Sequence, residues 1–179
     1  DIVLTNKVSL NAQTLANLPE LQYIGVMATG YNVVDLDAAH RHGVLVTNVP
    51  AYSTNSVVQM VFAFLLHHAQ HAALYNQKVH AGDWSACEDF SFRDAPLLEL
   101  TGKTMGIVGF GNIGRKVAAI GKQFGLRILV YTRNPEAYLE LNHVEDGYET
   151  TDFESLLRRS DIVTLHCPLN SETQELINS

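Results

Sequence analysis

The sequence predicts an α/β protein built on parallel sheets, and three observations support this. Apolar, β-branched runs alternate with segments of helical spacing, which is the order expected of parallel strands joined by helices. Hydrophobic residues make up 46% of the 179 residues, so a core can form and general disorder is excluded. A glycine-rich turn at 109–114 directly follows one apolar run and opens a helical segment.

The first 52 residues carry the alternation strand, helix, strand, helix, strand. Short runs rich in Val, Ile and Leu predict strands at 1–4, 21–27 and 44–49. Helices are expected between them, at 10–18 and 35–42. Pro19 and Gly43 follow the two helical segments and are typical stop signals.

A single long helix is expected at 57–79. Its first half is apolar nearly all round, which is typical of a helix buried between other elements or connecting two domains. The following segment, 85–100, contains Pro96 and several charges and predicts a surface loop. The predicted organisation is one α/β part at 1–52, a connecting helix at 53–84 and a second α/β part at 85–179.

The second part predicts four strands and two helices. The strands are expected at 103–108, 126–131, 144–149 and 161–167. The helices are expected at 115–124 and 152–159, so strands and helices again alternate. This order favours a second parallel sheet.

The charge balance argues against two classes of partner. Lys and Arg number 12 and Asp and Glu 19, which leaves a net charge of −7 with histidine neutral. Because the chain is acidic and has no basic run, we expect it to bind neither nucleic acid nor an anionic membrane surface. The most apolar run, 57–66, is too short to cross a bilayer.

The cysteines and histidines predict neither a disulfide framework nor a metal site. Cys87 and Cys167 are the two cysteines, a number that favours a reducing, cytoplasmic environment. His67 and His71 lie one helical turn apart, and this spacing is able to bind zinc. The favoured interpretation is that they occupy polar positions on the exposed end of a helix, and no metal is expected.

The turn GFGNIG places three glycines where a dinucleotide-binding loop needs them. Gly109 would make the tight turn, Gly111 would let the backbone approach a pyrophosphate, and Gly114 would let helix and strand pack closely. The amides of Asn112 and Ile113 would point at phosphate oxygens from the helix N-terminus. The alternative is a glycine turn that binds no ligand.

The end of the next strand bears on the choice between NAD and NADP. Thr132 stands where an acidic residue would bind the adenosine ribose of NAD, and Arg133 follows it. Loss of the acid removes the repulsion of a 2′-phosphate, and a guanidinium is able to clamp that phosphate. Arg133 is equally well explained as a solvated loop residue, so both NAD and NADP remain candidates.

Three separated motifs occur in the order ATGYNVVDLDAAHRHGVLVTNVPAYST, GKTMGIVGFGNIGRKVA and LLRRSDIVTLHCPLNSETQELIN. Together they resemble the D-isomer-specific 2-hydroxyacid dehydrogenase family, and most closely its glycerate dehydrogenase (hydroxypyruvate reductase) branch. The resemblance implies a Rossmann-type, doubly wound parallel sheet, incomplete here, and part of a flavodoxin-like α/β substrate domain. In chain order these are a partial substrate domain, the connecting helix and the first part of the NAD(P)-binding domain.

The resemblance also implies an activity. Such enzymes transfer a hydride between NAD(P)H and a small 2-oxo acid such as hydroxypyruvate or glyoxylate, using an arginine, a glutamate and a histidine. These three are expected beyond residue 179, so we expect no catalytic residue in this chain and no turnover from it alone. The alternative is a non-catalytic, NAD(H)-sensing regulatory protein of the same fold, like the corepressors of this family.

The resemblance assigns binding roles to residues outside the glycine turn. Thr29, Gly30 and Tyr31 match the loop whose backbone amides hold the substrate carboxylate, and Thr29 also matches a residue that touches the cofactor. Cys167 and Pro168 match the segment that lies against the adenosine half. A homodimer is expected, because the apolar surface of the helix at 57–79 exceeds one flank.

Overall fold

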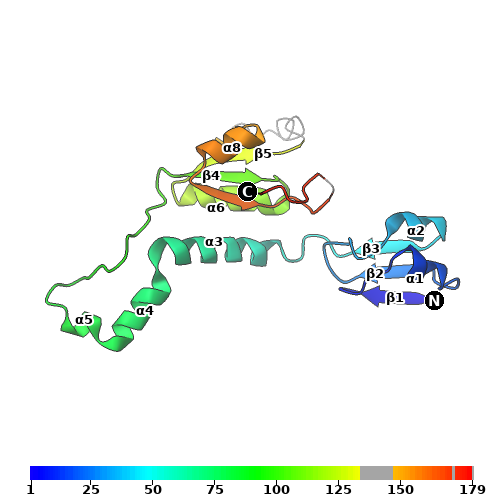
Figure 1. The fold of residues 1–179 in the computed structure, drawn as a ribbon, viewed down its shortest axis with the longest axis horizontal. Helices are drawn as coiled ribbons and strands as arrows, with labels where there is room; N and C mark the ends of the chain where they lie inside the picture. Colours follow the sequence, from blue (N-terminus) through cyan, green and yellow to red (C-terminus); the bar gives the residue numbers. More distant parts are fainter. Residues whose placement is uncertain (134–146, 171, 179) are drawn as a thin grey trace. The chain divides into compact units, whose positions relative to one another are not determined.

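The computed structural model describes residues 1–133, 147–170 and 172–178 of the chain. These residues form two compact units, Asp1–Thr54 and Asn55–Ser179. Each unit contains a parallel sheet with helices packed on it (Figure 1), so the predicted α/β class is confirmed. The finer division into 1–52, 53–84 and 85–179 stays a prediction.

The first unit is a three-stranded parallel sheet with the order β1-β2-β3. Its strands are β1 (Ile2–Thr5), β2 (Tyr23–Val26) and β3 (Leu45–Asn48), and its helices are α1 (Ala12–Ala16) and α2 (Leu36–Arg41). Both helices begin at a capping side chain. The carboxamide of Asn11 accepts a hydrogen bond from the Thr14 amide, and the carboxylate of Asp35 accepts one from Ala38.

One face of this sheet forms the core of the first unit. Ile24 and Val26 of β2 pack there with Leu15 of α1, and all three side chains are buried. Leu10 is not helical as predicted, because its amide donates to the Val33 carbonyl at 2.7 Å and it pairs with Val34 in a β-bridge. The helix predicted at 10–18 is therefore shorter than expected.

The helix predicted at 57–79 is two helices. α3 (Thr54–Gln70) and α4 (Ala72–Ala81) meet at His71, which has a left-handed φ of 48°, and they are bent by 56°. Gln70 Nε2 donates to the Leu98 carbonyl at 2.9 Å, and Leu98 N donates to the Ala69 carbonyl at 2.9 Å. The returning chain therefore holds the break, and the short helix α5 (Asp83–Ala86) follows α4.

The lengths and apolar character of the helices bear on whether the chain crosses a membrane. No single helix within the described ranges is long and apolar enough to cross a membrane, although α3 and α4 taken together across their bend meet the criterion of length and composition.

The second unit contains a four-stranded parallel sheet with the order β6-β5-β4-β7. The strands are β4 (Thr104–Val108), β5 (Arg127–Tyr131), β6 (Glu149–Thr150) and β7 (Ile162–Leu165), and the helices are α6 (Asn112–Gln123) and α8 (Phe153–Arg159). Of the strand predicted at 144–149, residues 144–146 lie outside the described residues.

Helices cover both faces of this second sheet, as Figure 1 shows for α6 and α8. Met105 and Ile107 of β4 point to the face covered by α3 and α6, where they pack with Val117 and other buried apolar side chains. Val108 belongs to the opposite face and packs with Leu156 of α8. This alternation confirms the doubly wound arrangement predicted from the sequence.

Candidate functional site

A cavity of about 720 Å³ opens at the carboxyl edge of the second sheet. It lies where β4, β5 and β7 end, and β4 is the strand with the other two on either side. The connection after β4 leads to β5 on one side, while the later β7 pairs on the other, so the cavity lies at the topological switch point. Ligands of open α/β sheets bind at this place.

The cavity brings together most of the sequence-predicted cofactor residues. Its lining includes Gly109, Gly111, Thr132, Arg133, Cys167 and Pro168. Asn112 and Ile113 form the first turn of α6 directly after Gly111, and Gly114 lies in the same turn, but none of the three lines the cavity.

Seven other lining residues were not predicted from the sequence. They are Val108, Phe110, Tyr131, His166, Glu172, Thr173 and Leu176. Each lies at, or shortly after, the carboxyl end of a predicted strand. That position was the available signal, because the ends of neighbouring parallel strands converge at one edge.

Gly109 makes the turn that leaves β4. Its φ is +91°, and its amide donates to the Tyr131 carbonyl at 2.9 Å. A Cβ at this position would lie 2.7 Å from the amide nitrogen of Cys167, so the chain after β7 closely approaches the turn. Both the backbone conformation and this contact require glycine.

Gly111 is the N-cap residue directly before α6, and it leaves the N-terminus of the helix open. No side chain caps this twelve-residue helix, and a Cβ at Gly111 would meet no atom within 4 Å. The first amides of a helix have no partner inside it and attract anions. Space beside a glycine backbone and unpartnered helical amides together fit a pyrophosphate group.

Gly114 has a different surrounding. A Cβ there would lie 2.2 Å from the carbonyl oxygen of Gly109 and 3.3 Å from Cγ2 of Ile107. The first turn of α6 therefore lies directly on the glycine turn and on β4. This contact holds the open N-terminus of α6 at the cavity.

Arg133 and Glu172 form an ion pair at the end of β5. The guanidinium Nη1 lies 2.8 Å from the Glu172 carboxylate, and the two side chains are 61% and 66% exposed. Both residues line the cavity, as does Thr132. The Arg133 guanidinium, a candidate partner for a 2′-phosphate, is therefore already paired with the Glu172 carboxylate.

His166 is half-buried in the cavity wall. Its amide donates to the Val108 carbonyl at 2.7 Å, and its Nε2 lies 2.9 Å from the Thr164 hydroxyl. Burial lowers the pKa of His166, because desolvation disfavours the charged imidazolium. Folding therefore favours the neutral ring over the charged one, relative to the unfolded chain.

This preference predicts a pH-dependent loss of stability. The unfolded chain has the higher histidine pKa, so it binds more protons as the pH falls through 6.5 and below, and the folded state loses stability there. The difference in unfolding free energy between wild type and His166→Asn should therefore shrink between pH 7.5 and pH 5. Urea titrations at several pH values measure it, with exposed His40→Asn as the control. A difference that stays constant with pH contradicts the prediction.

The loop 29–31 follows β2 at the carboxyl edge of the first sheet, separated from the strand by two residues. Asn48 Nδ2 donates to the Thr29 carbonyl at 2.8 Å, and the Thr29 hydroxyl donates to the Val49 carbonyl at 3.2 Å. The loop is thus tied to the end of β3 through Thr29. Gly30 and Tyr31 remain exposed.

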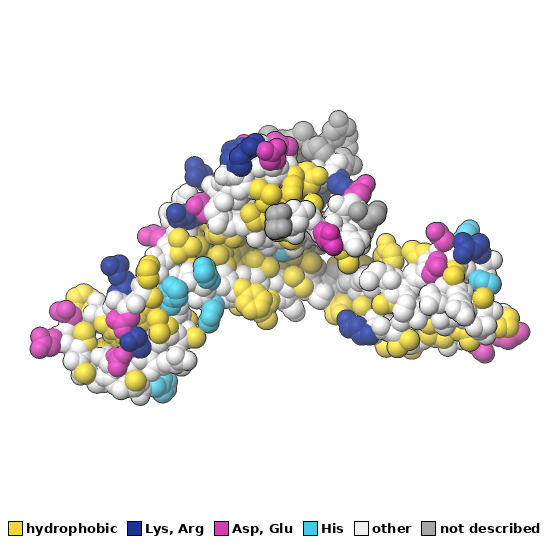
Figure 2. Space-filling view, in the orientation of Figure 1, with side chains coloured by type: hydrophobic (Ala, Val, Ile, Leu, Met, Phe, Trp, Pro, Cys, Tyr) yellow, Lys and Arg dark blue, Asp and Glu magenta, His cyan; other side chains and the backbone are white. Residues whose placement is uncertain are grey.

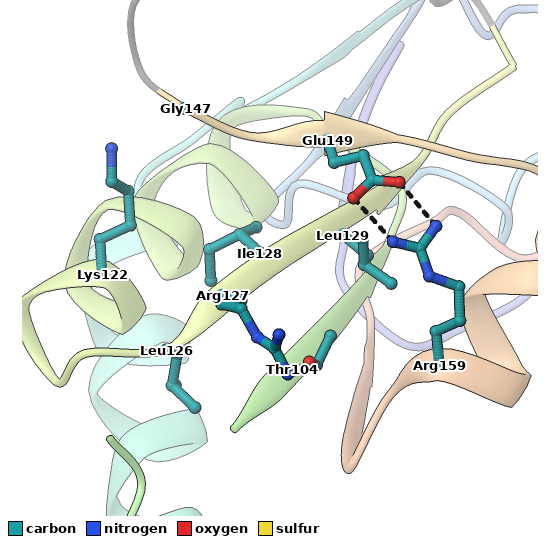
Figure 3. A pocket seen from close by; sticks show the side chains of 9 residues that line it. All are labelled: Thr104, Lys122, Leu126, Arg127, Ile128, Leu129, Gly147, Glu149 and Arg159. Atoms are coloured by element: carbon teal, nitrogen blue, oxygen red, sulfur yellow. Dashed lines mark hydrogen bonds and ion pairs between the residues drawn. The ribbon is translucent and has the colours of Figure 1, made fainter. Parts of the chain in front are cut away.

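A second cavity of about 570 Å³ opens at the opposite, amino edge of the second sheet (Figure 3). There Arg159, at the end of α8, forms two hydrogen bonds of 2.6 and 2.7 Å with Glu149. Nearby, Asp161 accepts a hydrogen bond of 2.8 Å from the Thr104 amide, and this bond lowers the pKa of that carboxyl. The Arg159–Glu149 pair thus links α8 to the start of β6, and Asp161, just before β7, binds the start of β4.

Metal ligation has no candidate cluster among the parts of the chain that the structure describes, where no three His, Cys, Asp or Glu side chains are grouped to hold an ion. The ring of His71 lies 3.0 Å from the Pro96 carbonyl, and Cys87 and Cys167 are free thiols.

A comparison with protein families matches residues 62–179 to the model described as D-isomer specific 2-hydroxyacid dehydrogenase, NAD binding domain. The match covers most of the chain and every lining residue of the cavity at the carboxyl edge of the second sheet.

Two curated relatives align with nearly the full chain. A hydroxypyruvate reductase of Blautia hydrogenotrophica is 40% identical over 99% of this chain, and a glycerate dehydrogenase of Methylorubrum extorquens is 34% identical over 100%. Each alignment covers 54% of the relative, so the chain spans about half the length of the curated relatives it matches.

Among solved structures, a D-lactate dehydrogenase from Aquifex aeolicus, complexed with NAD and lactic acid, matches with a TM-score of 0.81 and 30% identity. The match covers 96% of this chain and 49% of that one.

Proposed function

Because this chain belongs to the D-isomer specific 2-hydroxyacid dehydrogenase family, we propose that its protein interconverts a small D-2-hydroxy acid and the corresponding 2-oxo acid with NAD or NADP. Hydroxypyruvate or glyoxylate is the proposed 2-oxo acid, because similar proteins include the hydroxypyruvate reductase above and a glyoxylate reductase of Thermococcus litoralis that is 38% identical over 98% of this chain. The observation that carries the proposal is the switch-point cavity, in which the glycine turn presents the uncapped N-terminus of α6.

The residues of the cavity have proposed roles in holding the dinucleotide. The backbone at Gly109 and Gly111 gives the pyrophosphate room, and the amides of Asn112 and Ile113 donate to its oxygens. When bound, the nicotinamide supplies or accepts the hydride. Cys167 and Pro168, which also line the cavity, would flank the adenosine half, with Thr132 and Arg133 near its ribose.

The loop of the first unit has a proposed role in substrate binding. Backbone amides at Thr29, Gly30 and Tyr31 would donate to the substrate carboxylate, and Thr29 would also touch the cofactor. The hydrogen bonds from Asn48 and to Val49 support this role, because they fix the loop before a ligand arrives. A preorganised donor set loses little entropy on binding.

Turnover assays with the whole purified protein test the proposal, because residues 1–179 alone are expected to be inactive. NADH and NADPH are each supplied with hydroxypyruvate, glyoxylate and pyruvate, and oxidation of the reduced cofactor is followed by absorbance. We expect turnover with at least one pair. Dinucleotide binding without turnover across this panel contradicts the proposed activity and favours the NAD(H)-sensing alternative.

A cytoplasmic homodimer is also part of the proposal. The helices α4 and α5 bury no residue; Trp84 of α5 is 55% exposed, and Phe90, which follows this helix, is 92% exposed. Apolar side chains also reach the surface over α3 (Figure 2), where Met60 and Phe64 are exposed. Such unpartnered apolar surface favours association with a second copy.

Replacing Trp84 with glutamate is expected to convert the dimer to a monomer, because a charge would be desolvated in an apolar interface. Light scattering during gel filtration measures the mass. The charge control is Ser85→Glu, at the neighbouring exposed position. A wild-type protein that is monomeric at micromolar concentration contradicts the proposal.

A further inference from the structure

The adenosine end of the cavity holds one cation and one anion from different segments. Arg133 follows β5, whereas Glu172 lies in the segment after β7, and their side chains pair at 2.8 Å. Both line the cavity, and the residue between Arg133 and the strand, Thr132, is neutral. The carboxylate that the sequence lacks at the end of β5 is thus supplied from elsewhere in the fold.

The segment that carries Glu172 is held in place by its own hydrogen bonds. The Asn170 carboxamide oxygen accepts hydrogen bonds of 3.0 Å from the amides of Glu172 and Thr173. The Thr173 hydroxyl donates to the Pro168 carbonyl at 2.6 Å. Leu176 then packs against the apolar cluster under α8. The backbone of Glu172 is therefore tied at both ends, which keeps its carboxylate within reach of Arg133.

We propose that Glu172 is a specificity-determining residue that disfavours NADPH relative to NADH by engaging Arg133. A 2′-phosphate needs the guanidinium as its partner and would have to displace the carboxylate from it. The displaced carboxylate would then stand beside a dianionic phosphate. The 2′-hydroxyl of NADH carries no charge and meets neither cost. This inference rests on the proposed dinucleotide site.

The exposure of the pair sets the size of the effect. Because both side chains are more than half exposed, water and salt screen their interaction, and removing the carboxylate should not unfold the protein. The 2′-phosphate of NADPH carries about two negative charges and would lie within a few ångströms of the Glu172 carboxylate. Removing that carboxylate is therefore expected to change the affinity for NADPH relative to NADH about tenfold at low salt.

The test is a pair of dissociation constants for NADH and NADPH, measured by fluorescence of the reduced nicotinamide in 20 mM buffer. Glu172→Gln should lower the Kd of NADPH about tenfold and change that of NADH less than threefold. Glu175→Gln is the matched control, since it removes one carboxylate from the same segment at a position that does not line the cavity. It should leave the ratio of the two constants unchanged.

A double-mutant cycle asks whether Glu172 acts through Arg133. In an Arg133→Gln background, Glu172→Gln should improve NADPH binding by about twofold at most. A tenfold gain that persists without Arg133 contradicts the inference, as does an unchanged ratio in Glu172→Gln while both dinucleotides bind. If the wild-type protein binds neither dinucleotide, the proposed function itself fails, and the inference fails with it.

Discussion

Replacing Gly114 with alanine is expected to destabilise the protein by about 3 kcal/mol or more, despite the gain of about 1 kcal/mol in helix propensity. The added Cβ would lie 2.2 Å from the Gly109 carbonyl oxygen, a backbone atom that cannot rotate away. Either α6 moves off β4 or the glycine turn opens, and both disrupt the cavity wall. Urea unfolding followed by circular dichroism measures the loss.

Gly121→Ala is the matched control for this prediction, because it makes the same change in the same helix. A Cβ at Gly121 would meet the Cδ1 atom of Ile128 at 3.1 Å, which is the flexible end of a side chain. The control should therefore change the unfolding free energy by less than about 1 kcal/mol. Equal losses in the two variants would show that backbone contact at Gly114 is not the cause.

Gly111→Ser is expected to separate dinucleotide binding from stability. Its backbone, at φ −80° and ψ −158°, is open to any residue, and no atom lies within 4 Å of the new Cβ. Serine is also a better helix N-cap than glycine, so the unfolding free energy should stay the same or rise slightly. The serine hydroxyl would occupy the amides that the pyrophosphate needs, and its Cβ would fill the space beside them.

We expect the dissociation constants of NADH and NADPH to rise at least tenfold in Gly111→Ser, while the urea midpoint is unchanged. Fluorescence titration and urea unfolding of the same preparation measure the two quantities. Unchanged dinucleotide affinity would mean that the pyrophosphate does not approach this glycine, and the proposed site would then be wrong.

Most strands and the glycine turn were predictable, because their signals are local. The run KTMGIV ends in four residues without a polar side chain, and the corresponding strand, β4, is buried along its whole length. Gly109 and Gly114 follow it at the spacing of a known turn, and the structure shows backbone contacts that exclude a side chain at both positions. Local sequence carries such information without reference to distant residues.

Other features depend on contacts that the local pattern does not contain. The break at His71 is held by hydrogen bonds to the chain at Leu98, so helical periodicity alone suggested one long helix. Gly106 sits inside β4, where a Cβ would lie 2.4 Å from the Ser160 hydroxyl. The partnership of Arg133 with Glu172 likewise joins residues far apart in the chain. Tertiary packing determines all three.

The amino edge of the second sheet holds ion pairs and hydrogen bonds between strand starts, α8 and β7, whereas the proposed dinucleotide site lies at the carboxyl edge. The two edges are separated by the length of the strands. Substitutions at the Glu149–Arg159 pair or at Asp161 are therefore expected to change stability modestly and dinucleotide binding less. Stability and cofactor preference can therefore evolve, or be engineered, through substitutions at different edges of the same sheet.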